Sequence, residues 1–533
     1  MFDPKITPDE VFQRREEFGI ENSYRFLSEI LDNELESSKR ASLIKYLSLL
    51  GRDSPSLKEE CFNTLENILI SEENIEIKCE AAKGLSKLKY SAVLKPLKWM
   101  LEKGIESIDL KKAVLKAIYK TKFDIPEIEL FINELSSKYN VIKEYVRNQL
   151  ITIEPDILIK TLLSFIRKKN ISNSHKSEII KLIGYELKSF NLIFNDLSYI
   201  DVKYPEIIEN LKSNSEVLLN EITRLLREED EDLFSSVIMI LRLLGPGITR
   251  EIIKLIMNKD FIIKKNAIII AGKLCITEAV DLLVQDLDNI YNEVSIAAIE
   301  ALGAIGDISA VPELLSVLNI EDVSYEYTDL DMKLYIMDAI KNIYLKNPEA
   351  PYENLFKYLN SDNEMLKESI AFILGEIGDE QFEEPLSSLL KSNNVDVKKN
   401  TIIALGKIGI LNSLNPLINI LTNQNSYWLL KKVAIDSIYN IFQNNWYKLK
   451  DNDDPLKRIF NKNIALMIEF LNNSENENYK VILSLIKFLE DYGGEKALSA
   501  LLKRVNDFHR VVRIHASNAI KKIEEQLELE NQT

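Results

Sequence analysis

The sequence predicts an all-α fold in which helix pairs stack into a right-handed α–α superhelix, a solenoid. Gly and Pro are scarce, at 16 and 14 residues, which favours helices over sheets with many turns. Hydrophobic residues make up 46% of the chain, enough to bury a continuous core. Gly272 and Gly303 are 31 residues apart, as are Gly375 and Gly406, and this is the length of one helix–turn–helix unit.

The repeat is clearest in the second half of the chain. Residues 301–315 read Ala-Leu-Gly-Ala-Ile-Gly-Asp-Ile-Ser-Ala-Val-Pro-Glu-Leu-Leu, and residues 373–379 read Ile-Leu-Gly-Glu-Ile-Gly-Asp. Residues 404–409 return to Ala-Leu-Gly-Lys-Ile-Gly. Weaker copies bring the array to at least seven units. The N-terminal half repeats more loosely, although residues 84–97 fit the same template.

This motif resembles the short HEAT-like repeats first associated with phycobilisome lyases. In those repeats a Val-Arg element precedes the core, and Val397-Lys398 and Val512-Arg513 stand in the corresponding places. The resemblance implies a HEAT-like solenoid. It implies little about activity, because the shared positions are packing and capping positions.

Each unit can be explained from its residues. In the first helix of the unit at 293–304, apolar residues recur at spacings of three and four and form one buried stripe. Gly303 and Gly306 are expected to end that helix, since glycine accepts a left-handed conformation without penalty. Asp307 is placed to cap the second helix, and Pro312 falls in its first turn, where a missing N–H costs little.

Two stretches interrupt the repeat. A polar and acidic insertion at 319–331 lies between one pair and the next, and 443–455, which contains Trp446, lies between the two helices of one pair. The loss of regularity toward the N-terminus divides the chain into divergent helical repeats at 1–210 and a HEAT-like array at 211–533. The seam is expected at 169–176 and 190–205.

Composition also limits compartment and partner. The chain shows no signal peptide and no run of roughly 18 apolar residues, so we expect a cytoplasmic protein without membrane insertion. Cys61, Cys79 and Cys275 fit no disulfide or zinc pattern and are expected to be reduced core residues. The net charge of −16 disfavours nucleic acid. Neither the partner nor the oligomeric state can be deduced.

Enzyme interpretations find little support. HEAT-repeat deoxyhypusine hydroxylases use His-Glu pairs to hold iron, and none of His175, His509 and His515 is followed by Glu. HEAT-like DNA glycosylases need a broadly positive surface. No Walker loop, G-x-S-x-G or H-E-x-x-H motif occurs. We therefore expect no catalytic residue, no metal and no cofactor, and a lyase or other enzyme stays the alternative.

The favoured function is a scaffold or adaptor that binds another protein on a concave surface lined by the second helices. Candidate contacts lie off the apolar stripe of these helices: Glu313, Ser316, Ser387, Lys391 and Asn419. Trp446 is a competing candidate because it falls in an insertion. The basic residues of the last unit favour a polar capping helix, with a site for an anion as the alternative: His509, Arg510, Arg513, His515, Lys521 and Lys522.

Overall fold

The computed structural model describes residues 6–168, 170–194, 205–228, 230–319, 328–448 and 455–532. These residues form helices joined by turns and include no strand. The predicted all-α solenoid is confirmed. The chain divides into two compact units, Met1–Glu251 and Ile252–Thr533, with the boundary inside helix α17 (Thr249–Ile256). The division predicted after residue 210, which rests on repeat regularity, stays a prediction.

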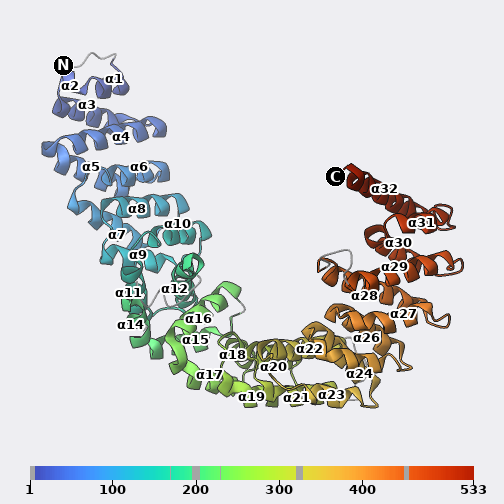
Figure 1. Ribbon diagram of the computed structural model, residues 1–533. Coiled ribbons are helices and arrows are strands. Elements are labelled where there is room, and N and C mark those ends of the chain that lie inside the picture. The colour runs from blue at the N-terminus through green and yellow to red at the C-terminus, as the bar shows by residue number, and fades with distance from the viewer. Residues whose placement is uncertain are drawn as a thin grey trace. The chain divides into compact units, whose positions relative to one another are not determined.

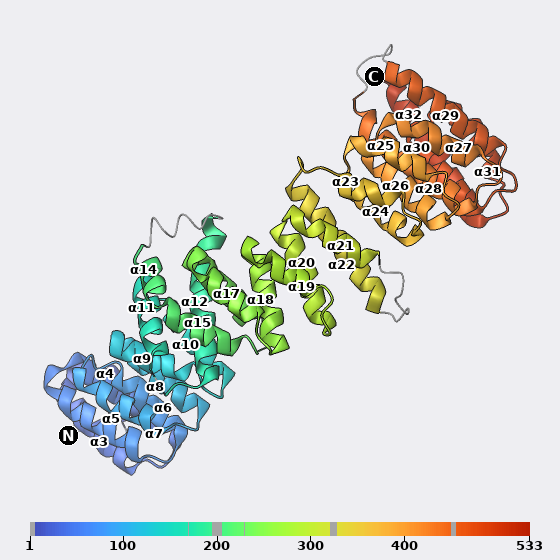
Figure 2. The same cartoon turned by 90° about the horizontal axis from the view of Figure 1, so that it is seen from below.

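The helices alternate between two layers within each unit (Figures 1 and 2). The first helices of all pairs together form one layer, which we call the first-helix layer. In the N-terminal unit these are α4 (Ser37–Asp53), α6 (Ile75–Leu85), α8 (Ile108–Thr121), α10 (Asn140–Leu150), α12 (Asn173–Phe194) and α16 (Glu231–Leu244). In the C-terminal unit they are α18 (Phe261–Lys273), α20 (Asn292–Ile305), α22 (Thr328–Lys346), α24 (Glu364–Ile377), α26 (Val395–Ile408), α28 (Trp428–Trp446), α30 (Tyr479–Tyr492) and α32 (Arg510–Gln532).

The second helices form the second-helix layer. In the N-terminal unit they are α5 (Lys58–Ser71), α7 (Leu94–Lys103), α9 (Ile125–Glu134), α11 (Pro155–Ile166), α14 (Pro205–Ser213), α15 (Ser215–Leu225) and α17. In the C-terminal unit they are α19 (Val280–Gln285), α21 (Val311–Leu318), α23 (Glu353–Leu359), α25 (Glu383–Leu389), α27 (Leu414–Thr422), α29 (Pro455–Asn472) and α31 (Leu498–Arg504). Helices α1 (Pro8–Gln13), α2 (Arg15–Phe18) and α3 (Ile20–Asn33) precede the first pair.

The turn between the two helices of a pair follows the predicted chemistry. Gly306 has a φ of 83° and caps α20, which is the left-handed conformation that glycine adopts without strain. The Asp307 carboxylate accepts a hydrogen bond from the Ser309 backbone N–H at 2.9 Å. It caps a 3-10 turn, Ile308–Ala310, that leads into α21. Pro312 lies in the first turn of α21, as predicted.

Gly303 does not end its helix. It lies inside α20, where a Cβ atom would come within 2.8 Å of the Ala339 Cα on α22. The same close approach recurs at Gly272 against Ala301 and at Gly375 against Ala404. These glycines therefore allow neighbouring first helices to meet backbone to backbone.

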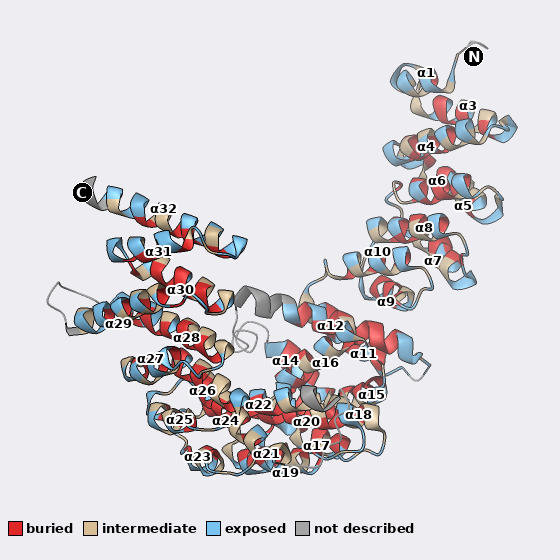
Figure 3. Cartoon of the chain, turned by 90° about the vertical axis from the view of Figure 1, so that its right-hand side faces the viewer, coloured by how far each residue is buried: buried red, intermediate tan, exposed pale blue. Residues whose placement is uncertain are grey.

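The hydrophobic core lies between the layers and between successive pairs. Figure 3 shows buried residues along the inward sides of the helices and exposed residues on their outward sides. In α20, Val294, Ala298, Ala301 and Leu302 are buried at the predicted helical spacing. The repeat pattern therefore identified the buried stripe correctly in this unit.

The two predicted insertions are shorter than expected. Residues 320–327 lie outside the described residues, and α22 already begins at Thr328. The second insertion was predicted from residue 443, but α28 continues to Trp446 and α29 begins at Pro455. The region between these two helices is the predicted place within a pair, and residues 449–454 lie outside the described residues.

The predicted seam contains more helix than expected. α12 begins at Asn173 and continues to Phe194, so it includes the ends of both predicted irregular stretches. Residues 195–204 lie outside the described residues.

By length and composition alone, one helical stretch among the described residues, Glu231–Ile256, could cross a membrane. It consists of α16, the 3-10 turn Gly245–Ile248 and α17. Val237 and Ile240 of α16 are buried, and α16 packs against α12. These contacts are those of a core helix pair in the array.

One of the three cysteines departs from its prediction. Cys61 and Cys79 are buried, and burial raises the pKa of the Cys61 thiol to about 12. Cys275 is exposed instead of buried. It lies in the turn after α18 with a φ of 53°, and its thiol donates to the Ala304 carbonyl at 3.6 Å.

Candidate protein-binding faces

The predicted contact residues lie on the second-helix layer of the C-terminal unit. Glu313 and Ser316 are exposed on α21, and Asn419 is exposed on α27. Lys391 is exposed just after α25. Ser387 on α25 is half-buried, and its hydroxyl donates to the Glu383 carboxylate at 3.1 Å. Four of the five are on the predicted helices, and Lys391 lies two residues after the end of α25.

The layer that carries these residues is not the inner one. In the C-terminal unit, neighbouring first helices contact each other extensively, whereas neighbouring second helices contact each other much less. An array bends toward the layer whose helices are closer together, so the first helices form its inner side, as Figure 1 shows for α20 and α28 against α21 and α27. The prediction that the second helices line the concave surface is wrong, because the glycine contacts bring the first helices together.

Trp446 is not in a loop. It is the last residue of α28, and its ring centroid lies 5.1 Å from that of Tyr492 and 5.6 Å from that of Phe460. The ring also stacks on Phe442 at 6.3 Å. Because 39% of the residue stays exposed, one side of this aromatic cluster is accessible. The expectation of an anchor mounted in an insertion is corrected to a partly exposed core residue.

The first-helix layer of the C-terminal unit carries ion pairs between neighbouring helices. Lys265 on α18 pairs with Glu293 on α20 at 2.6 Å, and Lys333 on α22 reaches Glu368 on α24 at 3.6 Å. Lys346 and Lys407 lie at the C-terminal ends of α22 and α26, where the helix dipole favours a cation. Lys407 pairs with Glu376, and Lys346 donates to the Ala304 carbonyl. Lys522, in the middle of α32, pairs with Glu490 and Asp491. Charges off the apolar stripe were visible in the sequence, but their partners about one repeat away were not.

The corresponding lysines of the N-terminal unit lack such partners. Helices α4, α6 and α8 are packed side by side (Figure 1), yet no ion pair connects any two of them. Lys45 on α4, Lys87 after α6 and Lys120 on α8 make no ion pair or side-chain hydrogen bond with the described residues. This part of the first-helix layer therefore presents cations that are not neutralised.

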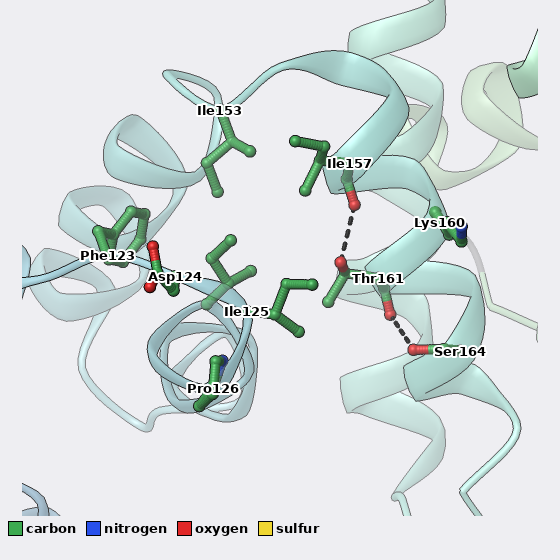
Figure 4. A pocket seen from close by; sticks show the side chains of 10 residues that line it. Phe123, Asp124, Ile125, Pro126, Ile153, Ile157, Lys160, Thr161 and Ser164 are labelled. Atoms are coloured by element: carbon green, nitrogen blue, oxygen red, sulfur yellow. Dashed lines mark hydrogen bonds between the residues drawn. The ribbon is translucent and has the colours of Figure 1, made fainter.

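Two pockets occur in the N-terminal unit, and neither gathers catalytic groups. A pocket of about 700 Å³ between α9 and α11 is lined mainly by Phe123, Ile125, Ile153 and Ile157 (Figure 4). Its hydroxyl groups serve their own helix, since Thr161 donates to the Ile157 carbonyl at 2.7 Å. The arrangement is that of an apolar surface groove.

The second pocket, of about 410 Å³, lies among α10, α12 and α16. Its two central cations are already paired, Arg147 with Glu178 and Lys181 with Asp230 and Glu178. Charges that neutralise each other in this way are structural ion pairs. The Ser236 hydroxyl in the lining donates to the Asp232 carbonyl of its own helix at 2.8 Å.

Buried titratable groups do not form a metal centre. No three His, Cys, Asp or Glu side chains come together as metal ligands in the part of the chain that the structure describes. His175 is buried on α12, where its Nε2 lies 2.6 Å from the Ile132 carbonyl and burial lowers its pKa. Burial also raises the pKa of Glu186 to about 7. The expected absence of a metal stays a prediction.

The basic residues of the last unit are largely used within it. Arg513 donates to the carbonyls of Asp507 and Phe508 at 2.9 and 3.0 Å, and His509 lies against the Tyr479 ring with centroids 4.7 Å apart. Lys521 reaches Glu525 at 3.7 Å. These contacts favour the capping interpretation over a site for an anion.

Comparison with protein families agrees with this architecture. Residues 352–438 match HEAT repeats, and residues 296–319 match the PBS lyase HEAT-like repeat. The chain contains HEAT repeats. The two HEAT matches cover α20 to α28 only in part, and they fall in the regular C-terminal unit. No curated protein matched the chain.

Solved structures of larger helical-repeat proteins are similar to the HEAT array. A crystal structure of importin beta is 13% identical, with a TM-score of 0.45, and the alignment covers 93% of this chain and 66% of that protein. A crystal structure of Kap121p is 12% identical, with a TM-score of 0.41, covering 98% of this chain and 64% of that protein. The chain thus spans just under two thirds of the length of these proteins.

Proposed function

We propose that this chain is a non-catalytic scaffold or adaptor that binds another protein, and that the partner lies along the first-helix layer. The observation that carries the proposal is that the helices bury their apolar sides and expose charged side chains on the first-helix layer. Apolar stripes are buried between helices, and rows of charged side chains remain on the open side of the closely spaced first helices. A repeat array uses such a continuous surface to hold an extended partner.

We propose that the chain acts in the cytoplasm and that its partner is a protein and not a nucleic acid. The net charge of −16 repels a long phosphate backbone. We propose neither membrane insertion nor a bound cofactor. The candidates Glu313, Ser316, Ser387, Lys391 and Asn419 lie on or next to the second-helix layer, outside the binding face proposed here.

The alternative of a lyase or other enzyme has no specific support in the described residues. The PBS lyase HEAT-like repeat at 296–319 matches residues such as Gly303, Gly306 and Asp307, which pack and cap helices. Neither pocket brings a base, a nucleophile and an oxyanion donor together.

The test is capture of partners on the immobilised full chain, followed by titration of each purified candidate. A genuine partner binds saturably, and chemical cross-linking then joins it to first-helix lysines such as Lys265, Lys333 and Lys399. Two variants act as matched controls: the charge exchange Glu313→Lys with Lys391→Glu on the second-helix layer, and Trp446→Ala. We expect both to bind within about twofold of the original chain.

Failure has distinct forms. If no purified candidate binds saturably, the scaffold proposal is wrong. Loss of binding in Trp446→Ala alone would move the site to the aromatic cluster at the end of α28. Loss in the Glu313 and Lys391 exchange alone would restore the second-helix layer as the binding face.

A further inference from the structure

Five cations lie on three neighbouring helices of the N-terminal unit, four of them near helix C-termini and one, Lys45, in the middle of its helix. We call them the basic cluster: Lys45 and Arg52 on α4, Lys83 on α6, Lys87 in the turn after α6, and Lys120 on α8. Lys45 and Arg52 are two helical turns apart and therefore share a face, and Lys83 and Lys87 are four residues apart. Lys87 is half-buried between the exposed others.

The cations are close enough to affect one another. Burial lowers the pKa of Lys87, and the positive charges of Lys45, Arg52 and Lys120 lower it further against the opposing effect of Glu80. Helices α4 and α8 both pack against α6, so Lys45, Arg52 and Lys120 lie on the two helices that flank Lys87.

Acidic residues neutralise only part of the basic cluster. Arg52 pairs with Asp53 at 2.8 Å, and Lys83 pairs with Glu80 at 2.5 Å. Lys45, Lys87 and Lys120 have no carboxylate partner among the described residues. Helix dipoles favour Lys83 and Lys120, which lie in the last turns of α6 and α8. They do not account for Lys45 in the middle of α4, or for three lysines on adjacent elements without an ion-pair partner.

We propose that the basic cluster binds an acidic segment of the protein partner, a run of Asp and Glu side chains. This inference rests on the proposed protein-binding function and adds the chemistry of the bound segment. Three unpaired ammonium groups on adjacent helices match carboxylates spaced along an extended chain. Their charge complementarity is local, since the protein as a whole carries −16.

A protein segment fits this surface better than a nucleic acid does. Single-stranded nucleic acids bind by stacking bases on exposed aromatic rings. The exposed large apolar residues on α4, α6 and α8 are Ile75 and Ile108, and neither is aromatic. A long polyanion would also extend from the basic cluster over the rest of an acidic protein.

The test measures binding of a fluorescein-labelled oligoglutamate peptide to the full chain by fluorescence anisotropy. We expect saturable binding that weakens as salt is raised. The triple variant Lys45→Gln, Lys87→Gln, Lys120→Gln should bind about tenfold more weakly. The matched control removes two ion-paired lysines from first helices of the C-terminal unit, Lys407→Gln with Lys522→Gln, and should change binding by less than about twofold. Circular dichroism checks that all variants are folded.

Three outcomes would overturn the proposal. They are no binding of the oligoglutamate, equal weakening by the triple variant and its control, or tighter binding of a single-stranded oligonucleotide at the same lysines. The proposed scaffold function is tested separately, because a captured partner that binds the triple variant with unchanged affinity would leave that function intact and reject only the acidic segment.

Discussion

The two units carry the same kind of helix pair and use its first helix differently. In the C-terminal unit, Gly272, Gly303 and Gly375 each lie against an alanine of the next first helix. Lys407 at the end of α26 meets an acid, and Lys346 at the end of α22 meets a carbonyl. In the N-terminal unit Gly184 makes a similar approach to the Ser236 backbone, but Gly84 on α6 faces side chains of Ser48 and Leu65, and the lysines near α6 stay unpaired. Regular packing and neutralised charge favour stability, whereas unpaired charge favours binding.

The largest expected effect separates the two kinds of glycine contact. In Gly375→Ala the new Cβ would lie 2.6 Å from the Ala404 Cα, so backbone must move, and we expect a loss of about 2 kcal/mol in unfolding free energy. In Gly84→Ala the Cβ meets movable side chains at 3.1 Å. Alanine favours the helix by about 1 kcal/mol relative to glycine, and this gain should offset the cost of the close contact.

Denaturant unfolding of the full chain, with hydrogen exchange followed in α24 and α26 or in α4 and α6, measures both glycine variants. Gly247→Ala is the control, since nothing lies near its Cβ position. Equal losses at residues 375 and 84 would contradict the difference drawn between the units.

The turn glycines of the two units should also differ. Gly378 has a φ of 77° and a ψ of 18°, the left-handed helical region, where alanine costs about 1 kcal/mol. Gly104 has a φ of 87° and a ψ of 124°, which lies outside that region and is more strained for any residue with a Cβ, so alanine should cost more there. No neighbour lies within 4 Å of either Cβ position, so contacts do not contribute. Thermal unfolding of Gly378→Ala and Gly104→Ala measures both losses, and equal losses would contradict this difference.

The smallest effect should have opposite signs in the two units. Lys87→Gln removes repulsion among like charges and should stabilise the chain by about 0.3 kcal/mol, whereas Lys407→Gln removes an ion pair and should destabilise it by about as much. Both effects should shrink in high salt. The unfolding free energies of both variants, measured at low and at high salt, show whether each substitution stabilises or destabilises the chain.

The Lys87 effect should also depend on pH. Its pKa in the folded chain is below the ordinary value of 10.5, so the cost of its charge is fully present below the folded pKa. As the pH rises through that value the cost falls, and the advantage of Lys87→Gln should disappear. An advantage that stays constant up to pH 10.5 would show that Lys87 does not titrate in this way.

Local features of the fold were predictable from the sequence. The period of Gly272 and Gly303, the cap at Asp307 and the left-handed Gly306 all follow from contacts within a few residues. The candidate face was not predictable in the same way. Gly303 was read as a helix end, although its role is to admit Ala339 from the next repeat. These contacts between glycine and alanine bring neighbouring first helices close together, and the first helices therefore form the inner layer.

The sequence by itself determined that the chain is a helical-repeat array, because apolar periodicity, caps and turn glycines act through nearest neighbours along the chain. Only the tertiary structure decided which helices come closest together and which lysines find a carboxylate. Lys407 meets Glu376, which is 31 residues away, whereas Lys87 meets other cations, and nothing in the local sequence of either lysine distinguishes them. Charges from different helices act through space, so their pairing depends on how the repeats stack.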